Sequence, residues 1–312
     1  MRMSEEKNTN ENLTEEKEAV TEITDTAAAS KTKKKKRKKG MNFLYWFLMA
    51  IFIGIFTFCA LYLIRYYGQD KKSKDTYEDL RELVVDEDNT EEEDVVYEAT
   101  ASDIPGQEFV VVDGKKILKR FRNLYHKNHD FYGWLKIDGT KIDYPVMYTP
   151  DNEEFYLYRD FNKENNNSGT PFVDTASDVE LPSDNILIYG HNMQTNTMFH
   201  DILQYEKEDF YKKHKKLTFD TIYGEGKYEV IAAFYTQIYG KNDTSHFKYY
   251  QFFNAANEND FDNYVTNCKA LTAYEIPTTA KYGDHLITLS TCAYHVEDGR
   301  FVVVAKKVED AD

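Results

Sequence analysis

An unbroken apolar stretch constrains this chain more than any other feature of its sequence. Residues 41–64 include no charged side chain. A helix needs about 20 apolar residues to cross a bilayer, and a helix satisfies its own backbone groups there. Aromatic residues lie near both ends, Tyr45 and Trp46 at one and Tyr62 at the other, as is typical of the two membrane interfaces. The alternative, a buried core helix, would have to hide every face inside a small domain. We therefore expect residues 41–64 to anchor the chain in a lipid membrane.

Charge on the two sides of this stretch predicts its orientation. Seven consecutive basic residues, Lys33 to Lys39, precede it, whereas Asp and Glu crowd the residues that follow. Basic residues are retained on the cytoplasmic side of a membrane. We expect a single-pass protein of the plasma membrane, with the N-terminus in the cytoplasm and everything after Arg65 outside the cell. A cleaved signal peptide is disfavoured, because a long polar segment precedes the stretch and no small-residue cleavage site follows it.

Composition divides the rest of the chain into three parts. Residues 1–40 are polar and poor in aromatics, which predicts a disordered, basic cytoplasmic tail. Residues 65–106 are acidic and predict a linker outside the membrane, extended by charge repulsion around Glu91 to Asp94. Within this linker, apolar residues at helical spacing predict a short amphipathic helix: Tyr77, Leu80 and Val84. Residues 107–312 form the predicted catalytic domain.

The overall charge and the cysteines exclude several classes of protein. The formal net charge is −15, and nucleic-acid binding needs a surplus of Lys and Arg, so we expect no nucleic-acid partner. The scattered carboxylates form no EF-hand pattern, and we expect neither a metal nor another cofactor. The cysteines are Cys59, Cys268 and Cys292. Cys268 and Cys292, the two outside the predicted membrane segment, could form one disulfide. A domain of this size does not need disulfides for stability, so one of the two is available for chemistry.

The segments of the C-terminal part predict a mostly β fold. Strand-like segments separated by turn residues cover 134–137, 141–148, 170–173, 185–189, 217–222, 227–236, 285–291 and 301–306. Helical patterns cover 115–127, 152–158, 198–205, 209–214 and 260–271. Short strands with few helices and no regular alternation of the two predict a β-barrel or sandwich with appended helices.

Cys292 ends one of these strands and is followed by a polar loop. Arg300 opens the next strand. If the loop reverses the chain, the two strands pair antiparallel and the two side chains face each other across its mouth. A thiol needs a cationic or dipolar neighbour to become a nucleophilic thiolate. Arginine cannot act as a base, but it can bind a developing oxyanion.

A histidine is the candidate acid or base for such a cysteine. Only His191 directly follows an apolar strand, and the Gly190 before it permits close approach by substrate or another chain. His295, in the loop after the cysteine, is a weaker competitor. The residues alone leave open a second interpretation, in which Cys292 is simply a buried strand residue. Cys268 lies on an apolar helix face and is predicted to be core.

Three motifs in the correct order resemble those of the sortase family. Thr-Leu-Ser-Thr-Cys at 288–292, followed by Arg300 in a Val-rich strand, resembles the active-site signature, and Tyr-Gly-His-Asn at 189–192 resembles the histidine motif. Further segments resemble class B members in particular: 131–146, 151–152, 169–174 and the helix-containing insertion at roughly 237–280. The resemblance covers about residues 107–308.

This resemblance implies a fold and a reaction. The expected fold is the sortase eight-stranded β-barrel with an N-terminal helix and an inserted helix. Cys292 would attack the threonine carbonyl of an Asn-Pro-x-Thr-type sorting signal, His191 would protonate the departing amine, and Arg300 would hold substrate and oxyanion. The acyl group would pass to an amine of peptidoglycan or its lipid-linked precursor. The implied partners are surface proteins with C-terminal sorting signals. The implied substrate-binding residues are Asn152, Leu157, Tyr189 and Ser290.

Two other functions remain as alternatives. A sortase of another class would usually lack the inserted helix, so helix content discriminates it. A catalytically silent, membrane-tethered binding module would have no reactive cysteine. The L,D-transpeptidases are disfavoured because their histidine lies two residues before the cysteine, where this chain has Ser290.

Overall fold

The chain folds into two compact units, Met1–Tyr67 and Gly68–Asp312. The structure, a computed structural model, describes residues 5–85, 95–96 and 106–309. Helix α1 (Glu5–Val85) runs through the first unit and ends in the second. The charge-repelled segment predicted at Glu91 to Asp94 lies outside the described residues.

Helix α1 carries the apolar stretch. Among the described residues, one helical portion, Phe43–Val84, is long and apolar enough to cross a membrane, and its most apolar window is not buried inside the protein. This is consistent with the predicted membrane anchor. The helix also includes residues 5–40, for which composition predicts disorder. Glu, Lys and Ala are strong helix formers, and the run from Glu5 to Lys39 has neither Gly nor Pro, which accounts for this difference.

The second unit begins with the last turns of α1, whose apolar residues pack on the domain. Tyr77 and Leu80 are buried, and Val84 is partly buried against the same core. The amphipathic helix predicted from these residues is therefore present. It belongs to the folded domain, however, rather than to a free linker, because burial of its apolar face favours docking over extension.

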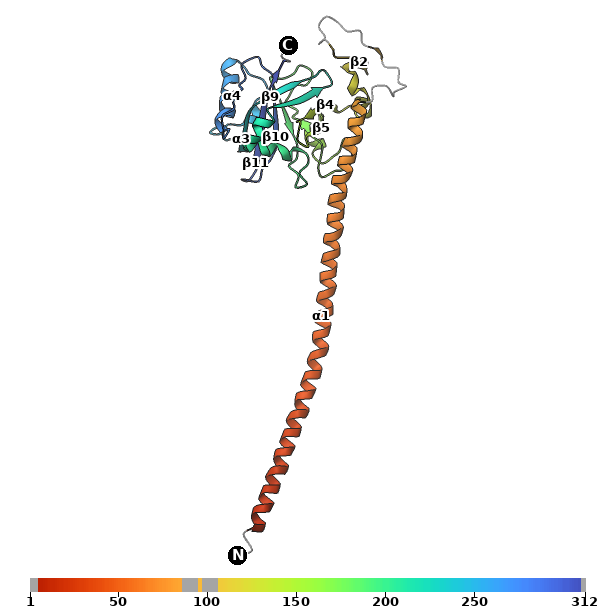
Figure 1. Ribbon diagram of the computed structural model, residues 1–312, viewed down its shortest axis with the longest axis vertical. Coiled ribbons are helices and arrows are strands. Elements are labelled where there is room, and N and C mark those ends of the chain that lie inside the picture. The colour runs from red at the N-terminus through yellow and green to blue at the C-terminus, as the bar shows by residue number, and fades with distance from the viewer. Residues whose placement is uncertain (1–4, 86–94, 97–105, 310–312) are drawn as a thin grey trace. The chain divides into compact units, whose positions relative to one another are not determined.

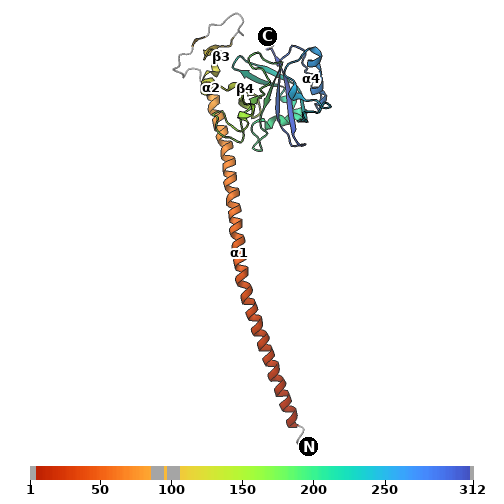
Figure 2. The same ribbon diagram turned by 180° about the vertical axis from the view of Figure 1, so that it is seen from behind.

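A small sheet precedes the barrel, and its last strand lies where the sequence predicted the start of a helix. Strands β1 (Val95–Val96), β2 (Phe109–Val112) and β3 (Lys115–Leu118) pair in that order. The helix predicted for residues 115–127 is wrong over its first turn, because Asp113 and Gly114 both have positive φ and form a tight hairpin turn. The remainder, residues 119–127, is helical, as η1 (Lys119–Phe121) and α2 (Arg122–Lys127). Figure 2 shows β3 close to α2.

Within the described residues, eight strands close a barrel, and the predicted fold is confirmed. In chain order they are β4 (Phe131–Lys136), β5 (Asp143–Met147), β6 (Phe172–Val173), β7 (Asn185–Tyr189), β8 (Lys216–Thr221), β9 (Lys227–Gln237), β10 (Leu286–Cys292) and β11 (Gly299–Val308). Around the barrel the order is β10-β11-β9-β8-β4-β5-β6-β7. Each strand predicted from residue 134 onward corresponds to one of these.

Helices occupy the connections between strands. They are η2 (Glu153–Tyr156), η3 (Phe199–Glu206), α3 (Glu208–Lys213), η4 (Tyr249–Gln251) and α4 (Glu258–Leu271). Asn257 caps α4, its side chain accepting a hydrogen bond from the Asp260 amide. Helix α4 lies on the outside of the barrel, near β9 (Figure 1). It supplies the inserted helix expected of class B.

Side-chain alternation along β10 divides the core into two clusters. Ile287 and Leu289 point into the barrel interior, whereas Leu286 packs in a second cluster beneath α4. This second cluster also holds Cys268, which is buried, as predicted for a core residue, and whose thiol is free. By the same alternation, Ser290 and Cys292 lie on the face of β10 that is directed away from the barrel interior.

Candidate active site

Cys292 and Arg300 are direct cross-strand partners. Cys292 is the last residue of β10, and its register places it opposite Arg300 on the antiparallel strand β11. Both residues are half-buried. Side chains opposite each other in an antiparallel pair project from the same face. The facing arrangement predicted from the loop between them is therefore confirmed.

His191 reaches the same strand end from the other side of β10. Strand β7 runs parallel to β10, with Tyr189 in register with Ser290. The Gly190 amide continues this pairing by donating to the Ser290 carbonyl at 3.1 Å. His191 is the next residue, which places it beside Cys292 at the end of the two strands. The side chain of Asn192 then donates to the Cys292 carbonyl at 3.0 Å and ties the two segments together.

Three adjacent strands thus deliver the three predicted residues to one end of the barrel. The order β7-β10-β11 carries His191, Cys292 and Arg300 side by side. His295, the weaker competitor, instead packs its ring against Tyr235, with ring centroids 4.7 Å apart.

The ring of His191 is oriented by a backbone carbonyl. Its Nε2 lies 2.8 Å from the Leu157 oxygen, and because a carbonyl can only accept, Nε2 carries a proton. In the neutral imidazole the lone pair is then on Nδ1. Burial lowers the pKa of His191 below its ordinary value, and the bond to Leu157 opposes this shift. The exposed ring of Tyr158 flanks the imidazole, with ring centroids 5.4 Å apart.

Close packing fixes the backbone around this histidine. A Cβ on Gly190 would lie 2.6 Å from the ring of Phe199, so no other residue fits there without a shift. The Phe199 amide in turn donates to the His191 carbonyl at 2.8 Å. The group that approaches Gly190 closely is therefore the protein's own Phe199, whereas the sequence led us to expect substrate or another chain.

Arg300 keeps its charge available. Its Nη1 donates to the carbonyls of Gly299 at 3.0 Å and Asp298 at 3.3 Å. Within the part of the chain that the structure describes, it forms no ion pair with a carboxylate. A half-buried guanidinium held by carbonyls alone can bind an anionic oxygen.

Tyr249 is a residue of this site that the sequence motifs do not reveal. It comes from η4, in the insertion between β9 and β10, and its hydroxyl lies 2.7 Å from the Ser290 hydroxyl. Burial raises the pKa of Tyr249 to about 12, and the positive charge of Arg300 partly opposes that shift. Tyr249 therefore contacts the strand that ends in Cys292. No local pattern marks it, because it reaches the site only through the folding of the insertion.

The four predicted substrate-binding residues have different surroundings. Ser290 is buried and bonded to Tyr249. Tyr189 donates its hydroxyl to Asp174 at 2.8 Å, and burial raises the pKa of both groups. Leu157 follows η2 and presents its carbonyl to His191. Asn152 is exposed at the N-terminal end of η2.

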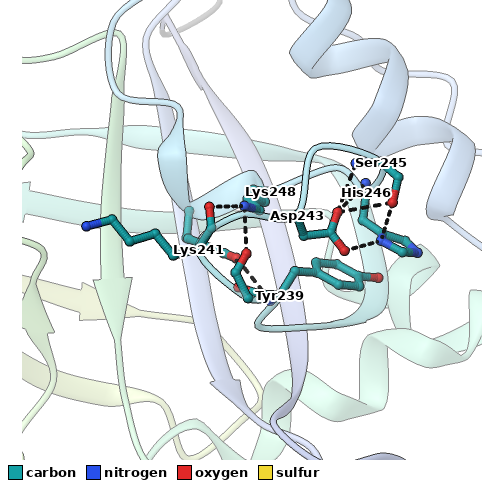
Figure 3. Close-up of polar contacts among 8 residues, drawn as sticks. Tyr239, Lys241, Asp243, Ser245, His246 and Lys248 are labelled. Atoms are coloured by element: carbon teal, nitrogen blue, oxygen red, sulfur yellow. Dashed lines mark hydrogen bonds and ion pairs between the residues drawn. The ribbon is translucent and has the colours of Figure 1, made fainter.

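The loop that follows β9 borders the site. Hydrogen bonds between its own residues connect its two ends (Figure 3). Thr236 of β9 is the cross-strand partner of Arg300, and the loop begins just beyond it. Lys248 donates to the carbonyls of Gly240 and Lys241 at 3.0 and 3.3 Å. The His246 ring stacks on Tyr239 and lies 2.8 Å from Asp243; this hydrogen bond lowers the pKa of Asp243. The first residues of the insertion are thus held together by hydrogen bonds and ring stacking within the loop.

Other candidate sites lie away from this strand end. A cavity of about 540 Å³ is lined by His285, just before β10, and Lys307, near the end of β11. These strand ends are the ones far from Cys292 and Arg300. Among the described residues, no group of three or more His, Cys, Asp or Glu side chains could hold a metal ion.

Known proteins with the same fold and sequence pattern are sortases. A family model described as the sortase domain matches residues 135–308. Sortase B of Staphylococcus aureus is 32% identical over 192 residues, covering 61% of this chain and 75% of that protein. Sortase B of Listeria monocytogenes is 32% identical over 195 residues, covering 62% and 76%.

Solved structures give the same result. A Staphylococcus aureus sortase B–substrate complex matches with a TM-score of 0.61 at 27% identity, covering 78% of this chain and 99% of that one. Clostridium perfringens sortase B matches with a TM-score of 0.54 at 32% identity, covering 60% and 99%.

Proposed function

Because this chain belongs to the sortase family and to its class B, and is a cysteine transpeptidase, we propose that Cys292, His191 and Arg300 are its catalytic residues. The observation that carries the proposal is the arrangement of β7, β10 and β11, which brings an imidazole, a thiol and a guanidinium to one strand end. Acyl transfer through a thioester requires a nucleophile, a group that carries a proton and a hydrogen-bond donor that stabilises the oxyanion.

In the first half of the proposed reaction, the Cys292 thiolate attacks the carbonyl carbon of threonine in the substrate. The carbonyl oxygen becomes an oxyanion, which the guanidinium of Arg300 stabilises. The carbon–nitrogen bond then breaks, and protonated His191 gives its proton to the departing amine. The product is a thioester between the threonine carbonyl and Cys292.

In the second half, an acceptor amine attacks the thioester. His191, now neutral, takes the proton that this amine loses. The carbon–sulfur bond breaks, the Cys292 thiolate is regenerated, and a new amide joins substrate and acceptor. Burial supports this role, because it lowers the pKa of His191 and so makes the imidazolium a ready proton donor.

The substrate is proposed to be a surface protein with an Asn-Pro-x-Thr-type sorting signal, cleaved after threonine. A similar solved structure is a sortase B–substrate complex, which supports a peptide signal as substrate. Leu157, Tyr189 and Ser290 are proposed to bind it, since all three adjoin His191 or the strand of Cys292. Asn152 is proposed as a more distant contact. The acceptor is proposed to be an amine of peptidoglycan or of its lipid-linked precursor.

The membrane helix supports a location in which these substrates are accessible. An anchor at residues 41–64, with the basic residues 33–39 retained in the cytoplasm, would hold the catalytic domain outside the cell. Cell-wall precursors and exported proteins are found on that side.

A cleavage assay tests the proposal. The full chain in detergent micelles is incubated with a panel of Asn-Pro-x-Thr peptides and a model amine, and the products are identified by mass spectrometry. We expect cleavage after threonine and transfer to the amine, both abolished in Cys292→Ala. Cys59→Ala, which removes a cysteine of the apolar stretch, is the matched control and should retain activity. Equal turnover by wild type and Cys292→Ala would end the proposal.

A further inference from the structure

Tyr77, in the last turns of α1, is buried against the catalytic domain. Its side chain is only 2% exposed, and its hydroxyl donates to the Gly169 carbonyl at 3.0 Å. Its ring packs edge-to-face on Tyr144, with ring centroids 5.0 Å apart. A tyrosine that follows a membrane anchor in sequence is thus inserted between two parts of the domain, the loop that holds Gly169 and strand β5.

The first of these contacts leads to the ring of His191. Gly169 has φ of +58°, and a Cβ there would lie 2.4 Å from the Leu157 oxygen, so the two backbones touch. That same oxygen accepts the proton of His191 Nε2. The Tyr77 hydroxyl is therefore separated from the acceptor of the catalytic imidazole by one residue, Gly169.

The second contact leads to the backbone of His191. The hydroxyl of Tyr144 accepts a hydrogen bond from the Met198 amide at 3.2 Å. Met198 has a positive φ of 56°, a strained conformation for this residue, which needs support from its surroundings. The next residue, Phe199, donates its amide to the His191 carbonyl. Tyr77 thus supports both the ring acceptor and the backbone donor that hold the histidine.

Two further contacts fix the loop to the same helix turns. The Asn166 side chain donates to the Ser73 hydroxyl at 2.7 Å, and both groups are buried. Lys72 pairs with Glu164 nearer the surface. The buried hydrogen bond between Asn166 and Ser73 stabilises this contact more than the ion pair does, because an exposed ion pair contributes little to stability. Together these contacts fix the segment 157–170 at several points to the helix.

We propose that Tyr77 is a positioning residue of the transpeptidase, holding His191 in its reactive orientation through Gly169 and Tyr144. The inference rests on the proposed catalytic role of His191. It makes the helix turns between the anchor and the barrel part of the catalytic unit rather than a spacer. Tyr77 itself does not touch the reacting atoms.

Tyr77→Phe tests this proposal in the full chain in detergent micelles. The variant keeps the ring on Tyr144 and removes the hydroxyl, with its bond to Gly169 and its hydrogen-bond contact with Thr170. We expect kcat to fall roughly tenfold with KM little changed, because small errors in the placement of a reacting group lower the rate more than binding. Ser73→Ala, which loosens the same loop from a different residue, should act in the same direction.

A second measurement reports on His191 directly. In a Cys292→Ala background, the His191 ring is titrated by NMR with and without Tyr77→Phe. The bond to Leu157 raises the pKa of His191 against the effect of burial. Weakening that bond should therefore lower the pKa further. A purely structural role for Tyr77 would leave this titration unchanged.

Tyr205→Phe is the matched control. Tyr205 is also fully buried, and its hydroxyl donates to a backbone carbonyl, that of His214, at 2.6 Å. Tyr205→Phe should lower the Tm by about as much as Tyr77→Phe does, without changing kcat or the His191 titration. The proposal is overturned if Tyr77→Phe matches wild type in both readouts, or if Tyr205→Phe lowers kcat equally. Activity in Cys292→Ala would instead refute the proposed function, so the two failures are distinguishable.

Discussion

The buried contact between Tyr249 and Ser290 allows a quantitative test of how the site is built. Tyr249 is 0% exposed and Ser290 is 1% exposed, and their hydroxyl oxygens are 2.7 Å apart. Within the described residues, neither hydroxyl makes another hydrogen bond. A buried hydroxyl that loses its partner pays for desolvation without compensation, at a cost of about 1–3 kcal/mol.

This arrangement predicts strong coupling between two substitutions. Tyr249→Phe leaves the Ser290 hydroxyl unpaired and should lower the free energy of unfolding by about 2 kcal/mol. Ser290→Ala leaves the Tyr249 hydroxyl unpaired and should have a similar effect. The double variant has neither hydroxyl, so we expect it to be about as stable as the single variants or more so, a coupling of about 2 kcal/mol.

Thermal unfolding followed by circular dichroism measures these differences, with the full chain at one detergent concentration. A loss of about 2 kcal/mol should lower Tm by about 4–8 °C for a domain of this size. Tyr235→Phe is the control: its hydroxyl donates to Glu206 at an exposed position, and its loss should shift Tm by about 1 °C. Strictly additive losses in the double variant would refute the reasoning, since they would mean that the two hydroxyls do not depend on each other.

Three further predictions concern His191 and the cysteines. Gly190→Ala forces a Cβ against the Phe199 ring and should lower peptide cleavage roughly tenfold or more; unchanged kcat would show that the strand end adapts. Burial lowers the pKa of folded His191 below its ordinary value of 6.5. Between these two pKa values the unfolded chain binds more protons than the folded chain, so the free energy of unfolding decreases as pH falls through this interval. His191→Gln should therefore lose less Tm than wild type between about pH 8 and about pH 5, and equal losses would contradict this. An alkylating agent should label Cys292 and spare Cys268, which is fully buried and whose pKa burial raises; labelling of Cys268 in the folded chain would argue against its place in the core.

Local sequence patterns were sufficient for most of the fold. The strand predicted at 185–189 matches β7 at both ends, and those predicted at 227–236 and 285–291 differ from β9 and β10 by at most one residue at an end. The helix predicted at 115–127 failed in its first turn. There the apolar spacing fits a helix, but the turn at Asp113 and Gly114 pairs the segment with β2 instead.

The candidate site was predictable in part for the same reason. Cys292 and Arg300 flank one short loop, so a hairpin alone brings them face to face. The motif around His191 was recognisable from its resemblance to a family. Tyr249 and Tyr77 were not recognised as parts of the site, because each reaches it by contacts with residues distant in sequence.

The sequence by itself determined the apolar stretch, the alternation that forms the barrel and the candidate reactive side chains. Hydropathy and strand periodicity are properties of neighbouring residues, so they can be read without a fold. Only the tertiary structure decided that β7 runs parallel to β10, which joins Asn192 to a cysteine 100 positions away, and that the helix turns after the apolar stretch pack on the loop beside His191. Such pairings depend on the burial of whole surfaces against one another, and no local pattern encodes which surfaces will meet.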